Sequence, residues 1–63
     1  MDIKTVKEAI TKGKLVTYDD SNYIVTAYIL RFNGKWQHLL ELKDLKANSV
    51  RIVPMEKVEV ENE

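Results

Sequence analysis

The chain has 63 residues, with ten basic and ten acidic side chains, so it forms one small domain of no net charge. A chain of this length buries only roughly 60% of the surface that it exposes when unfolded, which leaves room for a single core. The absence of cysteine excludes a disulfide scaffold, a thiolate metal site and a cysteine nucleophile. No apolar run reaches membrane-spanning length, and we expect a cytoplasmic protein without a signal peptide.

The charges are unevenly distributed along the chain. Residues 1–22 are balanced, residues 23–53 carry five basic and two acidic side chains, and residues 54–63 carry one lysine and four glutamates. Proteins that bind nucleic acid usually have an overall basic excess, because contacts to phosphate dominate their affinity. The acidic end cancels the local excess here, which favours the mixed surface of a small soluble protein.

Residues 2–12 predict a short amphipathic helix. Asp2 is a favourable N-cap, because its carboxylate can accept a free backbone N–H, and Gly13 can adopt the positive φ that ends a helix. So short a helix is marginal alone and must dock on the rest of the chain. The side chains expected on its docking face are Ile3, Val6 and Ile10, flanked by Ala9.

The remainder of the chain predicts short strands joined by tight turns. β-Branched and aromatic runs alternate with Asp, Asn, Ser and Gly, which favour turns. Pro54 cannot donate to a sheet ladder and predicts a tight 3₁₀ turn over residues 54–57. The five expected strands are residues 15–18, 23–32, 35–43, 49–53 and 58–60.

Asn33-Gly34 indicates a hairpin with a two-residue type I′ turn. Such a turn would place Phe32 opposite Lys35 and Arg31 opposite Trp36, where the guanidinium can stack on the indole. One face of the hairpin would then carry Val25, Ala27, Ile29, Arg31, Trp36, His38, Leu40 and Leu42. The other face would carry Ile24, Thr26, Tyr28, Leu30, Phe32, Lys35, Gln37, Leu39, Glu41 and Lys43.

This order of elements predicts a mainly β fold, in which a short N-terminal helix precedes a five-stranded, partly open barrel over residues 14–60. The bent second strand, the tight hairpin and the stretch from Val53 to Val60 resemble SH3-like β-barrels. The alternative is an α+β arrangement with the helix packed on an antiparallel sheet. Residues 1–63 would form a single domain, with residues 61–63 as a frayed acidic tail.

Catalytic residue patterns are missing from the chain. His38 is the only histidine, and no serine lies in a glycine-flanked elbow that would make it a nucleophile. The two glycines have turn roles, so no phosphate-cradling loop is present, and one histidine cannot form a zinc site. We therefore expect a protein that is not an enzyme and that uses no cofactor or metal.

The aromatic residues point instead to binding. Apolar and aromatic side chains remain on the second hairpin face, which a chain of this size lacks material to cover, so we expect a homo-oligomer that binds a protein partner. The expected contact residues are Tyr28, Leu30, Arg31, Phe32, Trp36 and Leu39. The alternative is a small nucleotide- or nucleic-acid-binding barrel (a signal sponge or a binder of single-stranded DNA or RNA), with Lys43 and Arg51 as candidate anion contacts.

The segments 6–16 and 41–44 are similar in style to short proteins of phages and mobile elements of low-GC Gram-positive bacteria. Residues 6–16 also resemble the opening of the Thoeris anti-defence sponge proteins, which are small phage oligomers that sequester signalling nucleotides. The Trp-Asn-Gly motif of that family is replaced here by Tyr18-Asp19-Asp20, so no ligand residues are transferred. A phage origin would imply inhibition of a host protein by steric occlusion.

Overall fold

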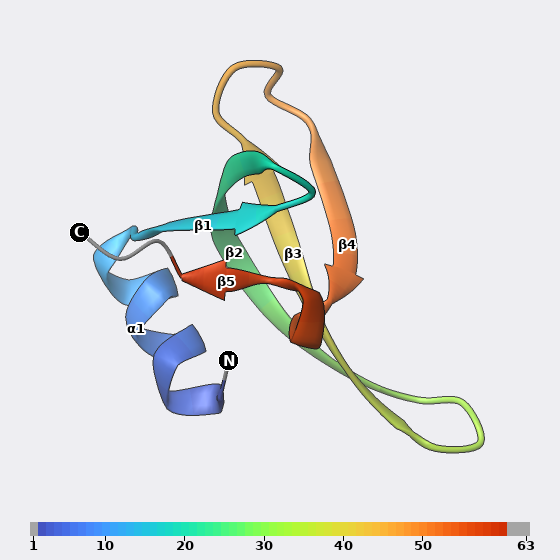
Figure 1. Cartoon of the computed structure of the whole chain (residues 1–63). Helices are drawn as coiled ribbons and strands as arrows, with labels where there is room; N and C mark the ends of the chain where they lie inside the picture. The colour runs from blue at the N-terminus through green and yellow to red at the C-terminus, as the bar shows by residue number, and fades with distance from the viewer. Residues whose placement is uncertain (1, 61–63) are drawn as a thin grey trace.

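The computed structural model describes residues 2–60, so the predicted tail at 61–63 lies outside the described residues. The fold is mainly β, with one short helix and a five-stranded antiparallel sheet in the order β4-β3-β2-β1-β5 (Figure 1). The sheet is not closed into a barrel. The elements are α1 (Ile3–Lys12), β1 (Leu15–Tyr18), β2 (Ser21–Phe32), β3 (Trp36–Asp44), β4 (Val50–Pro54), η1 (Met55–Lys57) and β5 (Glu59–Val60).

Both predicted ends of α1 are confirmed. The carboxylate of Asp2 accepts the backbone N–H of Thr5 at 2.8 Å, which satisfies one of the free donors in the first turn. Gly13 adopts φ 65°, and its N–H donates to the carbonyl of Ala9. Local capping therefore defines both ends of the helix.

The docking face of α1 is narrower than predicted. Val6 and Ala9 are completely buried, whereas Ile3 remains 43% and Ile10 37% exposed. The sheet contacts α1 along the side that carries Val6 and Ala9, which are three residues apart. The two isoleucines therefore lie at the edges of this contact. At ten residues, α1 is the only helix longer than one turn in the described part of the chain, and it is too short to cross a membrane.

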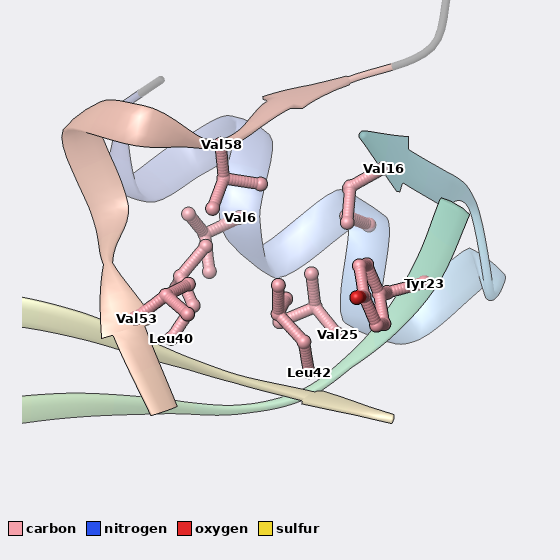
Figure 2. Packing of buried hydrophobic residues seen from close by; sticks show 9 residues of the cluster. Val6, Val16, Tyr23, Val25, Leu40, Leu42, Val53 and Val58 are labelled. Atoms are coloured by element: carbon pink, nitrogen blue, oxygen red, sulfur yellow. The ribbon is translucent and has the colours of Figure 1, made fainter. Parts of the chain in front are cut away.

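The core lies between one layer formed by β2, β3 and β4 and a second layer formed by α1, β1 and the segment before β5. In Figure 2, Val25, Leu40 and Leu42 rise from β2 and β3 toward Val6 of α1, Val16 of β1 and Val58 near β5. This burial is the main source of stability in so small a chain. Within residues 2–60, the buried apolar residues are Val6, Ala9, Val16, Tyr23, Val25, Leu40, Leu42, Val53 and Val58.

The type I′ turn occurs in a different hairpin from the one predicted. Asp19 and Asp20, with φ of 51° and 62°, form the two-residue connection between β1 and β2, and Tyr18 pairs with Ser21. The β2–β3 connection contains three residues, because Phe32 pairs with Trp36 and not with Lys35. Within this loop, Gly34 has a φ of 77°. The predicted two-residue turn at Asn33-Gly34 is therefore wrong.

A β-bulge restores the predicted register further down the hairpin. The expected pair Val25–Leu42 is present, but from Ala27 to the tip every pair is displaced by one residue. Thr26, at the bulge, donates its hydroxyl to Oε1 of Glu41 at 2.7 Å. One extra residue in β2 interrupts the two-residue alternation of side chains. Val25 and Tyr28 consequently lie on the same face, because their partners Leu42 and Leu40 do.

Candidate interaction surface on the β2–β3 hairpin

The outer part of the β2–β3 hairpin projects away from the rest of the molecule (Figure 1). We call residues 28–38 the aromatic arm. Three of its apolar side chains are more than half exposed: Leu30 at 51%, Phe32 at 61% and Trp36 at 62%. Large apolar side chains at such exposure, gathered on one projecting element, are typical of an interaction site.

Cross-strand pairing places the exposed side chains together. Tyr28 pairs with Leu40, Leu30 with His38 and Phe32 with Trp36. Because paired residues share a face and alternate pairs repeat it, these residues continue the face on which Leu40 is buried. We call its exposed continuation the arm face; it consists of Tyr28, Leu30, Phe32, Trp36 and His38.

Two aromatic contacts join side chains of the arm face across the strands. The Phe32 and Trp36 rings meet edge to face, with their centroids 5.1 Å apart and their planes at 61°. The Tyr28 and His38 rings stack at 5.9 Å, and the Tyr28 hydroxyl forms a hydrogen bond with Nδ1 of His38. A surface ordered in this way loses little side-chain entropy when it binds.

A hollow of about 340 Å³ adjoins the arm face. Its wall is formed by residues 35–39, which include side chains of both hairpin faces, and by Pro54, Met55 and Glu56. The side chain of Met55 also packs against the core, so this wall is anchored. The hollow adds a concave, partly apolar border to the exposed aromatic surface, and such borders receive protruding side chains of a partner.

The predicted contact residues divide between the two faces of the hairpin. Tyr28, Leu30, Phe32 and Trp36 lie together on the arm face. Arg31 pairs with Gln37, and Leu39 pairs with Ile29, which places both on the opposite face. The predicted pairing of Arg31 with Trp36 is therefore wrong, and Phe32 takes the position across from the indole.

The two candidate anion contacts also lie apart. Lys43 pairs with Val50, while Arg51 pairs with the buried Leu42, so their side chains lie on opposite faces of the sheet. The Arg51 guanidinium carbon is 5.7 Å from the centre of the Tyr18 ring, a cation–π geometry. The two side chains therefore do not form a shared basic patch beside the arm face.

Sequence reasoning missed His38 and Met55 as members of the site. The alternation of β3 placed Trp36, His38 and Leu40 on one face, which is confirmed. The error arose in β2, where the bulge reversed the faces of Tyr28, Leu30 and Phe32. Met55 had no local signal, because its position beside the arm depends on how β4 returns along β3.

The chemistry of the arm face is that of packing and hydrogen bonding. In residues 2–60, no three His, Asp or Glu side chains are grouped to hold a metal ion.

Comparison of the chain with protein-family models, with curated proteins and with solved structures found no match. The resemblances to SH3-like barrels, phage proteins and nucleotide sponges therefore stay predictions.

Proposed function

We propose that this protein is a non-enzymatic, self-associating interaction protein that binds a protein partner through the arm face. The observation that carries this proposal is the joint exposure of Leu30, Phe32 and Trp36 on one ordered, projecting face. A partner that covers these side chains removes their remaining apolar surface from water, which favours binding. Aromatic anchors of this kind dominate the binding energy of many protein interfaces.

A protein partner is favoured over a nucleic acid by the position of the charges. A base-stacking surface needs cations beside its aromatic rings to contact the phosphates. Arg31 lies on the face opposite the arm face, and the guanidinium of Arg51 lies against Tyr18 of β1. Among the described residues, Lys35 at the hairpin tip is the one basic residue that lines the hollow. Binding of oligonucleotides that weakens steeply with salt would contradict the proposal.

Site-specific photo-crosslinking in the cells that naturally contain the protein tests this proposal. A photo-crosslinking amino acid replaces Lys35 at the arm tip, or Leu45 in the β3–β4 loop as the matched control. Leu45 is 54% exposed, and Lys35 is likewise exposed. We expect one protein to be captured from position 35, not from position 45, and to be lost when Phe32→Ser and Trp36→Ser are added.

Capture at both positions, or capture that persists in the double serine variant, would contradict binding through the arm face. The serine variants are suited to this test because both positions are more than 60% exposed, and replacing them leaves the core intact. Circular dichroism of the double variant checks that the sheet is retained.

We further propose that the sheet curls into a partly open SH3-like barrel. The support is the pairing of β1 with both β2 and β5, together with the 3₁₀ turn η1 immediately before β5. An experimental structure tests this finer description. A sheet that curls until β5 lies across the core from β4, with the outer edge of β4 left free, would support the partly open barrel, and a flat sheet covered by one helix would contradict it.

A further inference from the structure

Strand β4 forms an open edge of the sheet. It pairs with β3 along one side and is the last strand in the sheet order among the described residues. Figure 1 shows β4 at the border of the molecule, with no described segment along its outer side. An open edge carries backbone groups that can bond to a further strand.

The ladder between β3 and β4 shows which backbone groups point outward. The N–H of Asp44 donates to the carbonyl of Ser49 at 2.8 Å, so these two residues form a hydrogen-bonded pair. Hydrogen-bonding direction alternates along an antiparallel strand, so Arg51 and Val53 bond to β3. The N–H and C=O groups of Val50 and Ile52, and the C=O of Pro54, therefore face outward. Pro54 lies where its missing N–H removes no bond to β3.

We infer that β4 pairs antiparallel with β4 of a second copy, about a two-fold axis at Ile52. In this register, Ile52 exchanges two hydrogen bonds with Ile52 of the second copy. The N–H of Val50 in each copy donates to the Pro54 carbonyl of the other. The two outward N–H groups of the edge, those of Val50 and Ile52, then both donate a hydrogen bond to the second copy. Pro54 only accepts in this register, so its missing N–H removes no hydrogen bond.

The charge on β4 selects this register over its nearest competitor. A two-fold axis at Arg51 would also form four hydrogen bonds, but it would set the two Arg51 side chains directly opposite each other in a close, non-hydrogen-bonded pair. Like charges in that position are destabilising. With the axis at Ile52, Arg51 faces Val53 of the second copy, and its guanidinium stays over Tyr18.

The exposed side chains of β4 suit a second copy of the same chain. Val50 and Ile52 are 54% and 49% exposed, although both are β-branched and apolar. Pairing about Ile52 brings the two isoleucines together and places Val50 beside Pro54 of the second copy, so apolar groups meet apolar groups. The surface is self-complementary, as a two-fold dimer requires.

This inference rests on the self-association in the proposed function and names its contact, which is separate from the arm face. Sedimentation equilibrium of the full chain measures the dimer. We expect Ile52→Lys to weaken dimerisation about tenfold or more, because two lysines would oppose each other at the axis. Leu45→Lys, at a 54% exposed position in the β3–β4 loop outside the paired strand, is the matched control and should retain the dimer.

An equimolar mixture of the Ile52→Lys and Ile52→Glu variants provides a rescue. Each variant alone should be monomeric, and the mixture should form a heterodimer through opposite charges at the axis. In the wild-type dimer, the amide protons of Val50 and Ile52 should exchange more slowly with solvent than in the Ile52→Lys monomer.

The β4 dimer would be overturned by a wild-type chain that is monomeric at every concentration, by loss of the dimer in Leu45→Lys but not in Ile52→Lys, or by failure of the mixture to associate. Loss of the dimer in the Phe32→Ser, Trp36→Ser variant would likewise overturn it, because association would then depend on the arm. The partner capture from position 35 described above does not depend on these results, so the two proposals fail separately.

Discussion

Tyr28 and His38 are joined twice, by ring stacking at 5.9 Å and by the hydrogen bond between the Tyr28 hydroxyl and Nδ1 of His38. Tyr28 is half-buried against the core, while His38 is exposed at the start of the arm. The pair therefore lies where the projecting hairpin leaves the body of the protein. Because Tyr28 also packs against the core, this pair links the conformation of the arm to the packing of the core.

The Tyr28–His38 hydrogen bond should contribute measurably to stability. Tyr28→Phe removes the hydroxyl but retains the ring, and we expect the free energy of unfolding to fall by about 1 kcal/mol. Urea denaturation followed by circular dichroism measures this change. His38→Phe and the double variant complete a double-mutant cycle, and a coupling energy near zero would contradict the role given to this bond.

Leu40 is one of the two completely buried leucines of the core. This residue is completely buried between β2 and β4, so Leu40→Ala should lower the free energy of unfolding by about 2–5 kcal/mol. Leu45→Ala, at a 54% exposed position, is the matched control, with an expected change within about 0.5 kcal/mol. Thermal and urea unfolding of both variants test the difference. Equal losses would show that the core is placed wrongly.

The β1–β2 turn can be improved by substitution. Asp19 and Asp20 both have positive φ, which Asn and Gly adopt at lower cost. The double variant Asp19→Asn, Asp20→Gly should raise the free energy of unfolding by about 0.5–1 kcal/mol, measured by urea denaturation. The paired Asp19→Ala, Asp20→Ala variant should lower it. If both variants were equally stable, the turn would not have this conformation.

Two aspartates make the fold sensitive to acid. The backbone N–H of Thr5 lowers the pKa of Asp2 below its ordinary value of 3.8, and the N–H groups of Lys46 and Ala47 lower the pKa of Asp44 in the same way. A carboxylate with a lowered folded-state pKa stabilises the fold above its ordinary pKa, and this contribution is lost as the pH falls through the lowered value.

The stability of the wild-type chain should therefore decrease below about pH 4. Asp2→Asn and Asp44→Asn retain an acceptor oxygen but cannot titrate, so the double variant should lose less stability between about pH 5 and pH 2. Urea midpoints across this range measure the effect. Glu56→Gln, on an exposed residue of η1, is the control, and an equal flattening by that variant would contradict the assignment.

Local features were predictable from the residues themselves. The helix follows from the cap at Asp2 and the positive φ of Gly13, and the 3₁₀ turn follows from Pro54. These signals depend on groups within a few residues of one another, so the neighbouring sequence is sufficient to produce them. The alternation of β3 was readable for the same reason, and it placed Trp36 and His38 on the face of Leu40.

Only the tertiary structure decided the register of the β2–β3 hairpin. The bulge at Thr26 and the three-residue loop shift every pair from Ala27 to Phe32, which moves Tyr28, Leu30 and Phe32 to the face of Trp36. The physical reason is that register minimises the free energy of the whole sheet: the bulge brings Tyr28 onto the face of Val25 and Leu40, where it packs against the core. Composition and turn residues establish a helix and five strands, while the shared packing of separate segments determines which side chains form the binding surface.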